Sequence, residues 1–222
     1  MTVVLVFMAV LMFVFVGWLV SQSINVQPWV AVTAGEINRS DPGIQAQPDT
    51  KVALVVLIAV LASLFALFMS AYVLRMELAD WRPVPEPVLL WLNTGLLALG
   101  SVGMHWAYTR SATSTRSQVV TGLFIAGVFL CLFIVGQLFA WQQLASLGYY
   151  ATSNPANAFF YLLTGLHIIH LVGGLVAWSA TMRKTLAAPD MAEVRLNIQL
   201  CGVYIHFLLV VWLVLFALLL NT

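Results

Sequence analysis

The chain has 222 residues, of which 62% are hydrophobic and only 8% are charged. Soluble domains carry about 25% charged residues, so this composition excludes a soluble globular protein and indicates an integral membrane protein. The formal net charge is +1 and no basic run is present, which excludes the electrostatic footprint of a nucleic-acid-binding protein.

The first segment is apolar over residues 2–20 and contains no basic residue. A cleaved signal peptide would begin with basic residues and carry a shorter apolar core, whereas about 19 apolar residues are enough to cross a bilayer as a helix. We therefore predict an N-terminal transmembrane helix over residues 1–20. Residues 21–51 are polar and hold several prolines and glycines, so we predict a connecting loop there.

Five further uncharged apolar runs have the length needed to cross a membrane. In lipid, every backbone polar group must be paired within the segment, so these runs are predicted to be helices and not strands. Their ranges are 52–74, 87–108, 119–145, 157–181 and 197–220. The predicted fold is an all-α integral membrane protein with six transmembrane helices, in which residues 52–222 form a five-helix bundle.

The breaks between these runs have recognisable local chemistry. The proline-rich segment from Arg82 to Pro87 cannot continue a helix. Asn154 followed by Pro155 predicts an N-cap with proline at the first helical position. Asp190 and Glu193 predict a variant capping box, in which Asp190 caps the last helix and Glu193 reaches back to it.

The distribution of lysine and arginine predicts the orientation in the membrane, because cytoplasmic loops carry an excess of these residues. The side facing outward holds only Arg75 and Arg82. The first, third and fifth loops hold seven basic residues: Arg39, Lys51, Arg110, Arg116, Arg183, Lys184 and Arg195. These loops are therefore predicted to be cytoplasmic, with both termini on the opposite, outer side of the membrane.

Few residues in the apolar runs could carry chemistry. All eight acidic residues lie in predicted loops or at helix ends, whereas ion-coupled transporters place carboxylates at mid-membrane. His167 and His170 lie three apart on one face of the fifth run. His170 and His206 fall at similar depth in antiparallel helices, a geometry that fits either haem ligation by two histidines or a hydrogen-bonded tie between helices. His105 is expected to be interfacial.

The residues themselves favour a structural interpretation. No further ligands converge on the histidines, so no catalytic, cofactor-binding or metal-binding residue is predicted in this chain. Polar side chains and glycines on membrane helices commonly join the helices of a bundle. The candidate structural or lipid-contact residues are His167, His170, Tyr204, His206, Trp212, Thr164 and Asn93.

Five stretches, in order, resemble subunit III of the haem–copper cytochrome c and quinol oxidases. FYLLTGLHIIHLVGGLVAW resembles that family's TGLHxxHxxGG signature, and YIHFLLVVWLVLFALLL resembles its last helix, YxHFxDxxWxxLF. LFALFMSAYVLR, LWLNTGLLALGSVGMHWA and GQLFAWQQL resemble its earlier helices. The resemblance covers about residues 52–220, and it identifies a short bacterial form with an additional N-terminal helix. It therefore implies a bacterial inner membrane, with both predicted outer termini on the periplasmic side.

This resemblance implies a non-catalytic, structural subunit of a proton-pumping terminal oxidase, which reduces oxygen in aerobic respiration. Haem and copper are then expected in partner subunits, with subunit I as the direct partner, and phospholipids are expected to bind between the helices. The sequence departs from the family where Leu209 replaces an aspartate, and where residues 59–63 lack a buried carboxylate. Without that acid, the histidines are expected to be neutral and bonded to carbonyls, Tyr204, Thr164 or a lipid.

Three alternatives stay open from the sequence. One is the accessory subunit of a nitric oxide reductase, which shares the fold. Another is a membrane cytochrome b with His170 and His206 as axial ligands. The third, a small-solute transporter, lacks the broken helices and paired repeats typical of that class.

Overall fold

The computed structural model describes residues 42–221 except for 86, 113, 114 and 189, with side chains from Thr50 onward. The chain divides into two compact units, Met1–Leu57 and Ile58–Thr222. Of the first unit, the structure describes residues 42–57, which belong to helix α2. The predicted N-terminal helix, residues 1–20, and most of the predicted connecting loop lie outside the described residues.

The described part of the chain is built from five helices. They are α2 Pro42–Met76, α3 Leu89–Arg110, α4 Arg116–Ser146, α5 Pro155–Ala187 and α6 Met191–Leu220. Helix α2 begins ten residues before the predicted start at 52, so the last part of the predicted connecting loop is helical. The segment from Arg82 to Pro87 separates α2 from α3, as its prolines predicted.

The prediction of six membrane-crossing helices is not supported. Among the described residues, four helical stretches are long and apolar enough to cross a membrane: Thr50–Met76, Arg116–Ser146, Pro155–Ala187 and Met191–Leu220. Helix α3, predicted as a span over 87–108, is not among them. Its sequence is interrupted by Asn93, Thr94, Ser101 and His105, and these polar side chains lower its mean hydropathy. The coarser prediction, an all-α multi-pass membrane protein, is confirmed.

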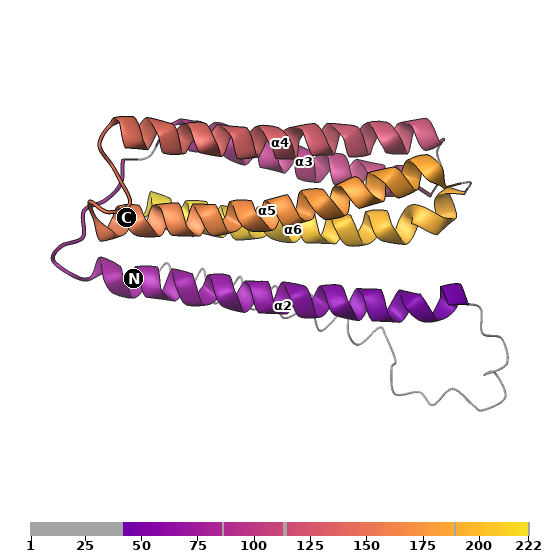
Figure 1. Ribbon diagram of the computed structural model, residues 1–222, viewed down its shortest axis with the longest axis horizontal. Helices are drawn as coiled ribbons and strands as arrows, with labels where there is room; N and C mark the ends of the chain where they lie inside the picture. The colour runs from indigo at the N-terminus through magenta and orange to yellow at the C-terminus, as the bar shows by residue number, and fades with distance from the viewer. Residues whose placement is uncertain (1–41, 86, 113–114, 189, 222) are drawn as a thin grey trace, which may run out of the picture. The chain divides into compact units, whose positions relative to one another are not determined.

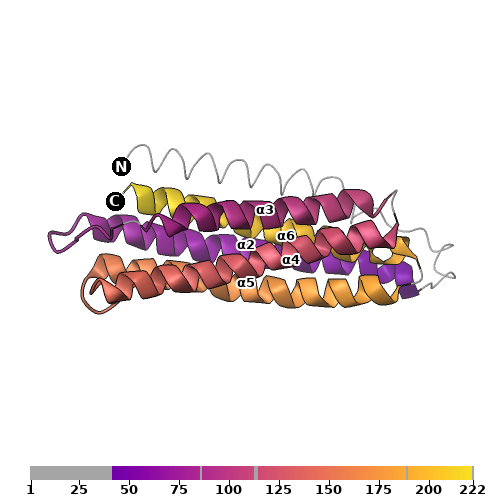
Figure 2. The same ribbon diagram turned by 90° about the horizontal axis from the view of Figure 1, so that it is seen from above.

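Within the second unit, α3, α4, α5 and α6 form a ring in which each helix packs against two others (Figures 1 and 2). Helix α3 contacts α4 and α6, and α5 contacts the same two helices from the opposite side. The segments between α3 and α4, α4 and α5, and α5 and α6 are short, so successive helices are antiparallel.

Helices α3 and α4 approach each other closely because glycines lie at their contact. A Cβ atom added to Gly103 would lie 3.1 Å from the backbone nitrogen of Ala126, and one added to Gly122 would lie 3.1 Å from Cα of Ala107. Small residues allow this approach in membrane bundles, where van der Waals packing replaces the hydrophobic effect as the force between helices.

The part of α2 in this unit, Ile58–Met76, packs through one face against α5. Its buried residues recur every three or four positions, as in a helix with one core-facing side: Ile58, Leu61, Phe65, Met69 and Tyr72. The ring of Phe65 lies 5.5 Å from that of His170, and the ring of Tyr72 lies 5.7 Å from that of Phe159, between centroids. Large aromatic side chains therefore make the contact between α2 and α5.

The helix ends follow local sequence signals. The Asn154 side chain accepts a hydrogen bond from the Ala156 N–H at 3.2 Å, with Pro155 at the first helical position, as predicted. Asp190 caps α6 by accepting from the Ala192 N–H at 3.1 Å. The reciprocal bond predicted for Glu193 is not present among the described residues, so Asp190 acts as a single cap.

Helix α4 ends in a glycine-dependent turn. Gly148 has φ +86°, a left-handed conformation that glycine adopts without a side-chain clash. The Tyr149 N–H donates to the Leu144 carbonyl and the Gly148 N–H donates to the Ala145 carbonyl, both at 3.0 Å. This is the Schellman pattern, which satisfies the last carbonyls of the helix.

Candidate functional site

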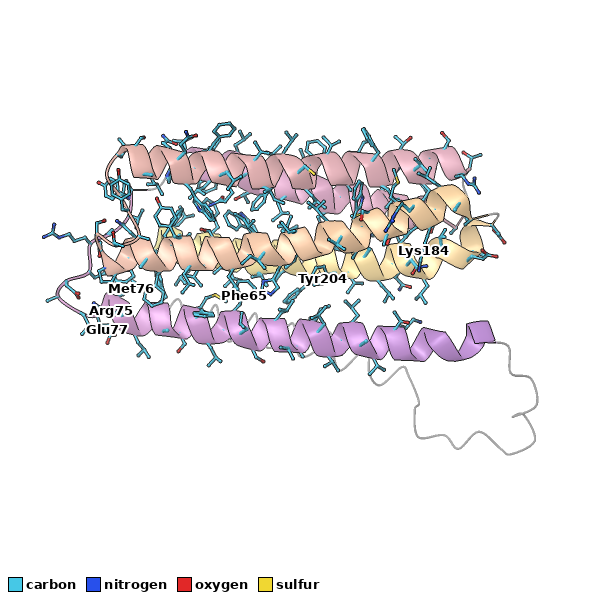
Figure 3. All side chains as sticks on the ribbon, in the orientation of Figure 1. Phe65, Arg75, Met76, Glu77, Lys184 and Tyr204 are labelled. Carbon is cyan, nitrogen blue, oxygen red and sulfur yellow. The ribbon has the colours of Figure 1, made fainter. Side chains whose placement is uncertain are left out.

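The predicted site residues lie in the interior of the helical ring and at the contact with α2. Asn93, Thr164, His167 and Trp212 are fully buried, and Tyr204 is 8% exposed. They come from α3, α5 and α6, and their partners come from the helices next to them. Figure 3 labels Phe65, on the side of α2 that faces α5, and Tyr204 of α6.

His167 lies in a cage of aromatic rings. Its ring centroid is 5.2 Å from that of Trp212, 5.8 Å from Phe133 and 6.3 Å from Phe65. Neither ring nitrogen has a hydrogen-bond partner among the described residues. The structure therefore shows no bond from this histidine to a carbonyl, Tyr204 or Thr164, and rings from α2, α4 and α6 surround it instead. The other expected partner, a lipid, stays a prediction.

His170 makes the hydrogen bond that was expected of it. Its Nδ1–H donates to the Leu166 carbonyl one turn earlier at 2.7 Å. The hydroxyl of Tyr204 donates to the His170 backbone carbonyl at 3.2 Å, which joins α6 to α5. The His170 ring also lies edge-on to Phe65 of α2, so this residue contacts two helices besides its own.

His206 faces a different helix from the one that the sequence suggested. Its Nδ1 forms a hydrogen bond with the Ser101 hydroxyl of α3, and its ring lies 6.1 Å from that of His105, between centroids. His170 instead lies against α2 through Phe65. The equal depth of His170 and His206 therefore does not place them in a facing pair, and the geometric basis for haem ligation by these two residues is lost.

Trp212 and Thr94 join α6 to α3. The indole Nε1–H donates to the Thr94 hydroxyl at 2.9 Å, and that hydroxyl donates to the Leu90 carbonyl at 2.8 Å. The Trp212 ring also packs edge-on to Phe133, with centroids 4.9 Å apart. Thus a single side chain contacts α3, α4 and α5 at once.

Asn93 joins α3 to α4. Its Nδ2–H donates to Oε1 of Gln137 at 3.1 Å, and both residues are fully buried. A Cβ added to Gly136 would lie 2.1 Å from the Asn93 side-chain oxygen, so the absence of a side chain at residue 136 makes room for this amide. Asn93 Oδ1 and Gln137 Nε2 have no hydrogen-bond partner among the described residues.

Thr164 joins α5 to α4. Its hydroxyl donates to the Phe160 carbonyl at 2.6 Å and accepts the indole N–H of Trp141 at 3.1 Å. A second indole, that of Trp178, donates to the Leu123 carbonyl at 2.9 Å across the same pair of helices. Its ring occupies the space beside Gly127. These tryptophan contacts were not predicted from the sequence.

Four residues at the candidate site were not predicted from the sequence: Phe65, Phe133, Ser101 and Trp178. The two phenylalanines are apolar residues within apolar runs, so the sequence does not distinguish them from ordinary core residues. Ser101 and His105 lie four residues apart, a spacing that places both on one face of α3 and could have indicated a shared partner. No group of three or more His, Cys, Asp or Glu side chains that could hold a metal ion occurs among the described residues.

The chain matches the family model of cytochrome c oxidase subunit III over residues 2–221. It is 30% identical over 168 residues to a probable cytochrome c oxidase subunit 3 of Mycobacterium bovis, covering 70% of this chain and 77% of the relative. It is 26% identical over 183 residues to cytochrome c oxidase subunit 3 of Synechocystis, covering 79% and 77%.

A similar relation holds for a protein of Thermostichus vulcanus named cytochrome c oxidase subunit 3, which is 26% identical over 178 residues. The family match begins at residue 2, so the expectation that the N-terminal segment lies outside the resemblance was wrong. Because the match extends over nearly the whole sequence, the chain belongs to the cytochrome c oxidase subunit III family.

Proposed function

We propose that this chain is the non-catalytic, structural subunit III of a proton-pumping terminal oxidase, packed beside catalytic subunit I in a bacterial inner membrane. Family membership supports the assignment to an oxidase complex. We further propose that haem and copper reside in the partner subunits and that phospholipids bind to this chain. The names of the matched relatives give no support to a nitric oxide reductase subunit.

The observation that carries the structural role is that a polar side chain bonds across every contact of the four-helix ring. Asn93 with Gln137 joins α3 to α4, Trp141 with Thr164 joins α4 to α5, Tyr204 joins α6 to α5, and Trp212 with Thr94 joins α6 to α3. Each such bond contributes about 0.6–2 kcal/mol in a membrane bundle. Together they favour one rigid arrangement, which is what a scaffold for a catalytic neighbour requires.

An apolar groove on α2 supports lipid binding. It has a volume of about 620 Å³ and is lined, among the described residues, by side chains of α2 outside its fully buried stripe: Ala59, Val60, Ser63, Leu64, Leu67, Phe68 and Ala71. The Ser63 hydroxyl donates to the Ala59 carbonyl of its own helix at 2.9 Å. The groove therefore offers an acyl chain an apolar wall without a competing polar group.

The ends of the helices support the proposed orientation. In the second unit, Arg110, Arg116, Arg183, Lys184 and Arg195 lie at one end, where α3 and α5 finish and α4 and α6 begin. Arg75 lies at the opposite end, as Figure 3 shows for Arg75 and Lys184. By the positive-inside tendency, the first end is cytoplasmic.

Since α3 runs beside α4 and ends at Arg110, we also propose that α3 crosses the membrane.

The test is to purify the chain with an affinity tag in mild detergent and record which subunits and which absorption bands accompany it. A haem–copper subunit and its Soret band are expected in the assembly, and no Soret band is expected from the isolated chain. The oxidase depleted of this chain should begin oxygen reduction at a normal rate and then lose activity over successive turnovers. Full activity of the depleted oxidase through prolonged turnover would refute the proposal.

A further inference from the structure

Three side chains from α3 and α6 meet at the contact between these helices and are not used by the proposed scaffold role. Ser101 and His105 lie one turn apart on α3, and both face His206 of α6. The Ser101 hydroxyl is hydrogen-bonded to His206 Nδ1, and the rings of His105 and His206 lie 6.1 Å apart between centroids, tilted by 45°.

The hydrogen bond to Ser101 occupies Nδ1 of His206, so Nε2 is the ring nitrogen that remains available to bind a ligand. Within residues 50–221, as far as the structure describes them, that Nε2 has no hydrogen-bond partner, nor has either nitrogen of His105. A histidine that ligates a metal is characteristically held by a hydrogen bond at its other nitrogen, which fixes the tautomer and the ring orientation. Ser101 holds His206 in this way.

The spacing of the two rings is close to that required for ligation of one ion. A Zn–N bond to histidine is about 2.0–2.1 Å long and zinc sites are usually tetrahedral, so two imidazoles on one ion have ring centroids roughly 5.2 Å apart. The observed 6.1 Å is slightly wider, so a small rotation of one ring is needed to bind an ion. His105 is exposed, so its ring has room to turn its nitrogen toward His206.

An ion arriving from water would reach the pair through His105, whose side chain is exposed. His105 is five residues before Arg110, the last residue of α3, and is therefore about 7.5 Å from the helix end. His206 lies deeper along its own helix, fifteen residues after Met191. Two cations near these helix ends are each held on an aromatic ring: Arg195 lies over Tyr108 and Arg110 over Trp106, at 5.6 and 5.9 Å.

We propose that His105 and His206 bind one divalent transition-metal ion of the class that prefers imidazole, such as Zn²⁺, with Ser101 as the positioning residue. Water completes the coordination, and the ion ties α3 to α6. This site is separate from the buried aromatic cage of His167 and requires no haem or copper of a partner subunit.

The experiment is a Zn²⁺ titration of the full-length chain in detergent after chelator treatment, followed by equilibrium binding and by thermal unfolding. One ion per chain is expected, with a higher unfolding temperature when Zn²⁺ is present. His105→Ala and His206→Gln should each weaken binding at least about tenfold, and Ser101→Ala about tenfold. The Gln variant retains a side chain able to bond Ser101, so a folding defect is separable from loss of a ligand.

His170→Ala is the matched control, because His170 lies on α5 against Phe65 and away from this pair. It should bind Zn²⁺ as the unmodified chain does. Wild-type affinity in a His105→Ala/His206→Gln double variant would overturn the proposal, as would equal loss of binding in the His170 variant. Mg²⁺, which prefers oxygen ligands, should neither bind nor raise the unfolding temperature.

Discussion

The indole Nε1–H of Trp212 on α6 donates to the Thr94 hydroxyl on α3 at 2.9 Å and so links two neighbouring helices of the four-helix ring. The Thr94 hydroxyl in turn donates a hydrogen bond to the Leu90 carbonyl of its own helix. The threonine oxygen therefore accepts a bond from α6 while its hydrogen is bonded within α3. Because the two hydrogen bonds are consecutive, both the indole N–H and the threonine hydroxyl have a protein partner and need no water.

Thr94→Val should therefore destabilise the bundle. The variant keeps the shape of the side chain but leaves the buried indole N–H without an acceptor, a loss of about 1–3 kcal/mol in the free energy of unfolding. Unfolding in mixed micelles measures this, and a double-mutant cycle with Trp212→Phe isolates the pair. Thr109→Val is the control, since the exposed Thr109 bonds only within its own helix; a loss as large there would contradict the assignment.

A substitution at Gly136 tests the packing of the Asn93 amide. Gly136→Ala places a methyl group 2.1 Å from Asn93 Oδ1, which must move and weaken its bond to Gln137. We expect a loss of about 1–3 kcal/mol in stability from this overpacking.

Gly95→Ala is the matched control, because nothing lies within 4 Å of a Cβ at that exposed position of α3. That variant should keep or raise stability, since alanine favours a helix by about 1 kcal/mol over glycine. Equal destabilisation by both substitutions would mean that helix flexibility, and not the Asn93 contact, controls the effect.

The aromatic cage predicts an unusual response at His167. Removing a buried polar group that has no partner relieves its desolvation cost of about 1–3 kcal/mol, whereas loss of ring contacts costs about 0.5–1.5 kcal/mol. His167→Leu should thus leave the unfolding free energy unchanged or increase it by up to about 2 kcal/mol. A loss of more than about 2 kcal/mol in the same unfolding assay would show that the ring nitrogens have a bound partner.

The turn after α2 predicts a pH-dependent contact. Two hydrogen bonds of 2.6 and 2.5 Å join the Arg75 guanidinium to the Asp80 carboxylate. These bonds hold the pKa of Asp80 below its usual value. A carboxyl group whose pKa is lower in the folded than in the unfolded protein stabilises the fold at pH values above its unfolded-state pKa of about 3.9. This stabilisation is lost as the pH falls through the folded-state pKa.

NMR titration of the Asp80 carboxyl carbon should accordingly give a midpoint below about 3.9. In Arg75→Gln the midpoint should rise toward that reference value, because the charged donor is removed. A midpoint in the unmodified chain that does not change with Arg75→Gln would show that the pair does not persist in solution.

The sequence determined the membrane class, the helical breaks and the family of this protein. These features are local: hydrophobic length fixes a helix in lipid, the prolines of Arg82–Pro87 keep α2 and α3 apart, and Asn154 and Asp190 cap α5 and α6. The family motifs likewise lie within single helices. Helix α3 departs from the expected pattern because its polar side chains, which lower its hydropathy, serve contacts with α4 and α6.

Only the tertiary structure decided which side chains meet. Depth along a helix follows from residue number, but the direction of a side chain depends on how neighbouring helices pack, so His206 lies against Ser101 of α3 while His170 lies against Phe65 of α2. In the same way, three rings from three helices surround His167. Hydrophobicity places residues in the bilayer, whereas close packing of specific side chains selects their partners.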